Sequence, residues 1–137
     1  MGRILALDYG RKRTGIAVTD NEKIIATALC TVQTKELLKY ISEYVNNEDV
    51  ESIVVGEPKD MNNRPSDSTK YIEPFVGVLK KKFPDMKIER YDERFTSKIA
   101  FQSMIDGGLS KKKRRDKAMV DKISAVLILQ SYLKSLE

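Results

Sequence analysis

Three segments of this chain carry acidic residues at places where a metal site could form. Two are apolar, strand-like runs that end on an acid, and the third is an apolar, helix-like run that an acid precedes. These acids are Asp8, Asp92, Glu93 and Asp121. Ligands of open α/β sheets gather where strands reach their carboxyl ends. Carboxylates that meet there can bind divalent ions, which catalyse hydrolysis of phosphate esters.

Each acid taken alone has a plainer interpretation. An acid after a strand is commonly a turn residue, and an acid in the first turns of a helix favours the helix dipole. The neighbours change this balance, because Asp8 is followed by Gly10 and both Asp8 and Glu93 are followed by cations. The cations are Arg11, Lys12, Arg13 and Arg94. Cations can meet phosphate oxygens while glycine lets backbone approach closely, so the pattern favours metal-assisted phosphate chemistry.

The composition narrows the chemistry further. The 137 residues include no histidine and one cysteine, Cys30. A histidine base, a Cys–His pair, a histidine metal ligand and an intramolecular disulfide are therefore excluded. Any metal must bind oxygen ligands, which suits Mg²⁺ or Mn²⁺. The short apolar runs predict no membrane span and no signal peptide, so we expect a cytoplasmic protein.

The positive charge of the chain is concentrated in one segment. Residues 110–117 (SKKKRRDK) have a net charge of +5, which equals the net charge of the whole chain. The remainder is thus balanced. The segment is either a nucleic-acid contact or a solvated loop before a helix, and the sequence favours neither.

Hydrophobic periodicity predicts nine elements in the order β-β-β-α-β-α-β-α-α. The expected strands are 3–8, 14–19, 24–32, 52–55 and 87–91, and the expected helices are 34–47, about 72–79, 96–106 and 117–135. Thr34 is the expected N-cap of the first helix, and Pro74 is expected in the first turn of the second or at a kink. Tight turns join the first three strands, while helical crossovers reach the other two. This order predicts an α/β fold with a mixed five-stranded sheet and helices on both faces, forming one domain over residues 1–137.

Four segments of the sequence resemble motifs of one family, in the same order. LDYGRKRTGIAVTD resembles D-x-G-x-x-R-x-G-x-A, IVVGEP resembles VVGLP, YDERFTS resembles DER-x-[ST]-[ST], and DKISAVLILQSYL resembles D-x-x-A-A-x-x-I-L. The chain thereby resembles the YqgF (RuvX) family. This resemblance implies an RNase H-like fold, as in Holliday-junction resolvases of the RuvC type. It also implies a metal-dependent nuclease that matures the 5′ end of 16S ribosomal RNA.

The resemblance assigns roles to particular residues. It implies that Asp8, Glu93 and Asp121 are the catalytic residues and the metal ligands, in a two-ion mechanism with Mg²⁺ or Mn²⁺. Glu57 stands where the family usually has leucine and is a further candidate ligand, although a solvated loop acid is the favoured interpretation. The predicted contacts to nucleic acid are Arg11, Lys12, Arg13, Lys59, Arg94, Lys111, Lys112, Lys113, Arg114 and Arg115.

Two other functions fit the same pattern. An RNase H-like domain that has lost its chemistry would bind RNA or assist ribosome assembly, but none of the three acids is missing here. A DNA junction resolvase would act as a symmetric dimer, and the sequence contains no obvious dimer helix. The partner that the resemblance implies is RNA, within a small-subunit ribosomal precursor, with structured DNA as the alternative.

Overall fold

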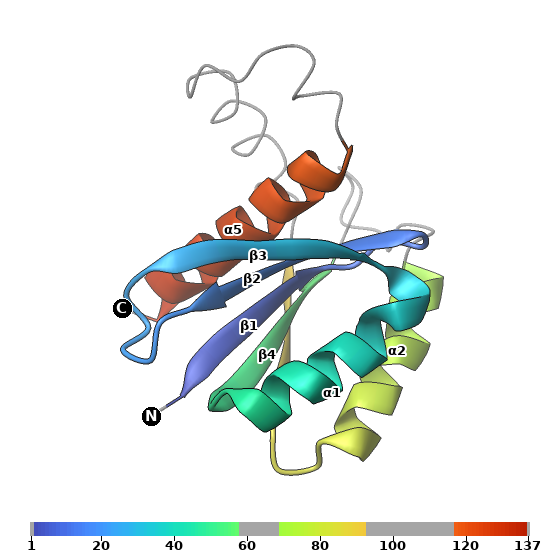
Figure 1. Ribbon diagram of the computed structural model, residues 1–137, viewed down its shortest axis with the longest axis horizontal. Helices are drawn as coiled ribbons and strands as arrows, with labels where there is room; N and C mark the ends of the chain where they lie inside the picture. The colour runs from blue at the N-terminus through green and yellow to red at the C-terminus, as the bar shows by residue number, and fades with distance from the viewer. Residues whose placement is uncertain (1, 58–68, 93–116, 137) are drawn as a thin grey trace.

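A mixed five-stranded sheet organises the protein, whose structure is a computed structural model that describes residues 2–57, 69–92 and 117–136 (Figure 1). The strands are β1 (Arg3–Asp8), β2 (Arg13–Thr19), β3 (Ala26–Gln33), β4 (Val50–Glu57) and β5 (Lys87–Asp92). They lie in the order β3-β2-β1-β4-β5. β1 pairs antiparallel with β2 and parallel with β4, as the turns and crossovers predicted.

Helices cover both faces of this sheet. They are the short 3₁₀ helix η1 (Thr34–Glu36), α1 (Leu37–Asn47), α2 (Thr69–Lys82) and α5 (Lys117–Ser135). In Figure 1, α1 and α2 lie on one side of the strands and α5 lies on the other. The predicted α/β fold is confirmed, whereas the helix expected at 96–106 lies outside the described residues.

Each face of the sheet has its own hydrophobic cluster, because side chains alternate along a strand. Leu5 and Leu7 of β1 pack with α1 and α2, while Ile4 and Ala6 pack with α5. β1 is therefore buried on both faces, which explains its uninterrupted apolar run.

β3 begins at Ala26, two residues later than the predicted strand. The Oδ1 atom of Asp20 accepts hydrogen bonds from the backbone N–H groups of Ile24 (2.8 Å) and Ile25 (3.0 Å), and Lys23 has a φ of 61°. These bonds lower the pKa of Asp20. They also close a turn that takes the two isoleucines out of the strand.

Two boundary predictions were wrong. Thr34 begins η1 rather than capping a helix with its side chain, because its hydroxyl donates to the carbonyl of Gly10 (2.6 Å). The helix expected at about 72–79 begins earlier, at Thr69, so Pro74 lies beyond the first turn of α2 and the predicted kink is the alternative that remains. α5 has the predicted bounds.

Candidate active site

The carboxyl ends of three neighbouring parallel strands form one edge of the sheet. β1 ends at Asp8, β4 at Glu57 and β5 at Asp92. Leu7 pairs with Val55, and Glu57 pairs with Asp92, so the three acidic positions are nearly level along this edge. The backbone therefore brings the ends of β1, β4 and β5 together at one edge of the sheet.

Asp8 occupies a firmly held position at this edge. The preceding residues Leu5, Ala6 and Leu7 are fully buried, and Asp8 itself is half-buried. Because side chains alternate along a strand, Asp8 belongs to the same face of the sheet as Ala6, which packs with α5. Asp8 pairs with Gly15 of β2. A strand packed on both faces fixes the location of the carboxylate, as a rigid metal or catalytic site requires.

α5 crosses the face of the sheet to which Asp8 belongs. In Figure 1 it begins on the side where β1 and β4 end, and it finishes near the amino end of β1. Its buried stripe includes Ala125, Ile128 and Leu129. Asp121 stands four residues before Ala125, so its helix position belongs to the same stripe. The side chain of Asp121 lies outside the described part of the structure.

Polar contacts fasten α5 to β5. Tyr91 and Ser131 share a hydrogen bond between their hydroxyls (2.5 Å), and the Tyr132 hydroxyl donates to the carboxylate of Glu89. The Lys87 ammonium beside Glu89 (2.9 Å) lowers the pKa of that carboxylate, with a further contribution from Tyr132. Burial, followed by the bond to Glu89, raises the pKa of Tyr132 to about 12. These contacts hold the helix at a fixed position across the sheet.

The described residues include only part of the predicted carboxylate set. Asp8 is described in full, Glu93 lies outside the described residues, and the side chains of Glu57 and Asp121 lie outside them too. Among the residues open to description, no three acidic or cysteine side chains lie close enough to hold a metal ion. The three-carboxylate site thus stays a prediction.

The turn between β1 and β2 carries a cationic surface. Arg11, Lys12 and Arg13 line a depression of about 440 Å³ together with Gln33 and Lys35. The last two carry no signal in the sequence, because the expected strands 14–19 and 24–32 would place residue 30 opposite Arg13, whereas the later start of β3 and a register shift between Ile16 and Ala17 place Gln33 there. The remaining predicted contacts lie outside the described residues: Lys59, Arg94, Lys111, Lys112, Lys113, Arg114 and Arg115.

Hydrogen bonds hold the β1–β2 turn against the end of β3. The Thr34 hydroxyl donates to the Gly10 carbonyl, and the Thr34 N–H donates to the Lys12 carbonyl (2.9 Å). The buried Thr14 hydroxyl lies 3.0 Å from the Thr34 hydroxyl. A Cβ atom at Gly10 would come within 2.4 Å of the Arg13 carbonyl oxygen, so this tight turn requires glycine.

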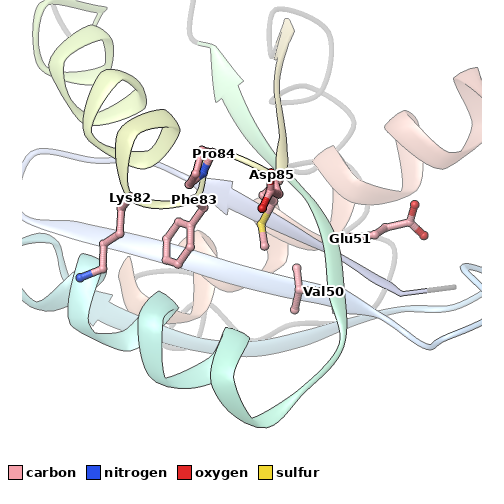
Figure 2. A pocket seen from close by; sticks show the side chains of 7 residues that line it. Val50, Glu51, Lys82, Phe83, Pro84 and Asp85 are labelled. Carbon is pink, nitrogen blue, oxygen red and sulfur yellow. The ribbon is translucent and has the colours of Figure 1, made fainter.

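A second depression lies at the other end of the sheet. Figure 2 shows it between the start of β4, at Val50 and Glu51, and the connection from α2 to β5, at Phe83 and Asp85. Its volume is about 470 Å³. Its lining has two acids, Glu51 and Asp85, and one base, Lys82, among apolar side chains. It lies far along β4 from the acidic edge, so it takes no part in the candidate site.

Comparison with solved structures identifies the fold class. RuvC from T. thermophilus in complex with a Holliday junction substrate superposes with a TM-score of 0.59 and 16% identity, over 99% of this chain and 96% of that one. A second structure of Thermus thermophilus RuvC gives a TM-score of 0.51, with 98% and 96% covered. The protein therefore has the RNase H-like fold of RuvC.

Sequence comparison then identifies the family. A family model described as "RuvX: Holliday junction resolvase" matches residues 2–135. Relatives from Christiangramia forsetii and Phocaeicola vulgatus, each named "Putative pre-16S rRNA nuclease", are 63% and 59% identical. These alignments cover 97–98% of this chain and of each relative. The chain belongs to the RuvX family, which confirms the resemblance predicted from its motifs.

None of the helices in the described ranges is long and apolar enough to cross a membrane.

Proposed function

We propose that this protein is a cytoplasmic, metal-dependent nuclease whose single RNase H-like domain, residues 1–137, hydrolyses phosphodiester bonds during 5′-end maturation of pre-16S ribosomal RNA. The observation that carries the proposal is the position of Asp8. Its carboxylate ends a strand buried on both faces, at an edge where two further acidic positions lie level with it. The names of the relatives support the reaction and the substrate.

Strand and helix periodicity support the catalytic set Asp8, Glu93 and Asp121. Asp8 follows Ala6 by two residues, so its position belongs to the face of β1 that packs with α5. Asp121 precedes Ala125 by four residues, so its position belongs to the same buried stripe of α5. On β5, Glu89 and Tyr91 contact α5, and the same two-residue period continued along the sequence selects Glu93 rather than Asp92.

The same parity argument counts against Glu57. Ile53 and Val55 of β4 pack with α1 and α2, whereas Val54 packs with α5. Position 57 has the parity of Val55, so it is expected on the face away from α5. We therefore favour Glu93 over Glu57 as the ligand that completes the set with Asp8.

The donor chemistry of this set fits Mg²⁺ or Mn²⁺. The acids supply hard oxygen ligands, the chain has no histidine, and Cys30 packs with the cluster on the α1 and α2 side. When bound, one or two such ions would activate water and stabilise the leaving oxygen. The carboxylates of Asp8, Glu93 and Asp121 would hold the ions.

The cations beside Asp8 would bind the substrate backbone. Arg13 pairs across the strands with Gln33 and has the parity of Gly15, the residue opposite Asp8, so it belongs to the same face. A guanidinium can donate two parallel hydrogen bonds to a phosphate. The further basic positions of the proposed nucleic-acid surface are Arg11, Lys12, Lys59, Arg94, Lys111, Lys112, Lys113, Arg114 and Arg115.

Replacement of Asp8 by asparagine tests this proposal. The change keeps the size of the side chain but removes the charge that would hold the metal ion. We expect cleavage of a pre-16S RNA fragment in Mn²⁺ or Mg²⁺ to fall by about a thousandfold. The thermal unfolding midpoint should stay within a few degrees of that of the parent protein.

Asp85→Asn is the matched control, because Asp85 is exposed at the opposite end of the sheet. It should cleave at the parent rate. Full activity of Asp8→Asn would refute the assigned site. Cleavage of a four-way DNA junction in preference to RNA would show that the proposed substrate is wrong. Tight RNA binding without cleavage in either metal would show that the protein is a binding module and not an enzyme.

A further inference from the structure

We infer that the depression between the β1–β2 turn and the end of β3 binds the phosphodiester next to the one that reaches Asp8, with Gln33 and Lys35 as binding residues. This inference rests on the proposed function, which puts the scissile phosphate at the acidic edge. It adds a second, non-reacting phosphate and two residues that neither the motifs nor the names of the relatives assign.

The depression has the chemistry of a phosphate site. Arg11, Lys12, Arg13 and Lys35 contribute four cations, and Gln33 contributes an amide that can donate hydrogen bonds. Among the described residues that line it there is no acid. Its volume of about 440 Å³ leaves room for a hydrated phosphodiester, since one water takes about 30 Å³.

Its distance from Asp8 matches one step of a nucleic-acid backbone. Asp8 lies opposite Gly15 on the neighbouring strand, and Arg13 is two residues from Gly15 along β2, so the backbones of Asp8 and Arg13 are about 8 Å apart. Successive phosphates of a nucleic-acid strand are separated by a similar distance. Gly15 has no side chain to obstruct a strand that runs between the two points.

The two sides of the depression are held together before any ligand binds. One side is the turn that carries Arg11–Arg13, and the other is the junction of β3 and η1. Thr34, between Gln33 and Lys35, bonds to the carbonyls of Gly10 and Lys12 (2.6 and 2.9 Å). The cross-strand pair Arg13–Gln33 adds a second link. A site fixed in this way loses little freedom on binding.

Lys35 and Gln33 would contribute differently to the bound phosphate. Lys35 is exposed and adds a positive charge, so its contact should release a counterion from the nucleic acid. Gln33 is neutral and adds a hydrogen bond, which should not depend on salt. This difference makes the two contacts distinguishable by their salt dependence.

The test measures binding of a short, labelled single-stranded RNA to the full chain carrying Asp8→Asn, in EDTA. Lys35→Ala in that background should weaken binding about fivefold at low salt and lower the slope of log Kd against log salt by about 0.7. Gln33→Ala should weaken binding about threefold with the slope unchanged.

Lys80→Ala is the matched control, because Lys80 is an exposed lysine of α2 that does not line the depression. If Lys35→Ala changes Kd and slope no more than Lys80→Ala does, the inference is wrong. A matching single-stranded DNA should show the same losses, because the contacts are to phosphate. Losses confined to RNA would overturn the assignment to phosphate.

A series of RNAs with one neutral methylphosphonate linkage locates the contact. In the protein that keeps Lys35, a methylphosphonate at the linkage next to the scissile one should weaken binding. In the Lys35→Ala variant, the same methylphosphonate should cause no further loss of binding. Equal losses at every linkage would overturn the inference. The readout is binding without cleavage, so a failure of the proposed catalytic site would appear in the Asp8→Asn cleavage assay and not here.

Discussion

The two faces of the sheet differ in the side chains that they bury. Toward α1 and α2, β1 presents Leu5 and Leu7, and the cluster there is built from large aliphatic residues. Toward α5, the central strands present Ala6 and Ala17, and α5 contributes Ala125 to the same cluster. Small residues let a helix approach the sheet closely, whereas large ones fill a wider gap with more apolar area.

This difference separates stability from function. Among the described residues, the α1 and α2 face has the larger hydrophobic cluster, and no residue of the proposed catalytic set is expected on that face. The α5 face adds hydroxyl contacts from Tyr91 and Tyr132 to a smaller cluster, and it continues along β1 to Asp8. We therefore expect damage to the first face to affect folding alone, and damage to the second to affect the site as well.

A pair of isoleucine truncations tests this separation with the largest expected effect. Ile41 in α1 and Ile128 in α5 are both fully buried. Each Ile→Ala change should lower the free energy of unfolding by about 2–5 kcal/mol, as denaturant titration would measure. Under conditions where both variants are folded, Ile41→Ala should keep its cleavage rate, whereas Ile128→Ala should lose about tenfold through misplacement of α5. Equal rates in the two variants would remove the functional distinction between the faces.

Removal of the Thr34 hydroxyl should have an intermediate effect. Thr34→Val deprives the Gly10 carbonyl of its donor and the buried Thr14 hydroxyl of its partner. We expect a loss of about 1–2 kcal/mol in the free energy of unfolding. Thr27→Val, at an exposed position of β3, should change it by less than about 0.5 kcal/mol and serves as the control. A Thr34→Val protein as stable as this control would show that the turn does not depend on these bonds.

The smallest effect is expected at the polar contact between α5 and β5. Tyr132→Phe removes the hydrogen bond to Glu89 and should lower stability at neutral pH by about 1 kcal/mol. The pKa of Tyr132 is raised to about 12, so above pH 10 the unfolded chain loses this proton before the folded protein does. Stability conferred by Tyr132 should thus be complete below pH 10 and disappear as the pH rises to about 12.

The measurement is the free energy of unfolding of the parent protein and of Tyr132→Phe across this pH range. The parent protein should lose stability more steeply between pH 10 and 12 than Tyr132→Phe. Other tyrosines with raised pKa values, such as Tyr9 and Tyr44, contribute to both and cancel in the difference. Parallel curves would indicate that the Tyr132 hydroxyl is not stabilised in its neutral form.

Much of the fold could be predicted because periodicity and turn residues agree along the chain. β1, with its apolar run and terminal Asp8, and α5, with its apolar centre, were placed correctly. The start of β3 could not be found from periodicity, because Ile24 and Ile25 look like strand residues. Hydrogen bonds from their backbone to Asp20 decide otherwise.

The candidate site was predictable only in part, for a similar reason. Asp8 has a local signal, since it ends an apolar run and is followed closely by Gly10 and by three cations. Gln33 and Lys35 have none, because their place beside Arg13 depends on the late start of β3 and on the register shift of its pairing with β2 between Ile16 and Ala17. Thr34 was mistaken for a helix cap because its actual partner, Gly10, lies 24 residues earlier.

The cluster beneath α5 joins the beginning of the chain to its end. Ile4 and Ala6 leave the ribosome well before Ile128 and Leu129, with which they pack. A nascent chain that lacks α5 leaves one side of its central strands exposed to water and to chaperones. Synthesis itself would thus delay assembly of the proposed site, because Asp8 and Asp121 could meet only after α5 has been translated.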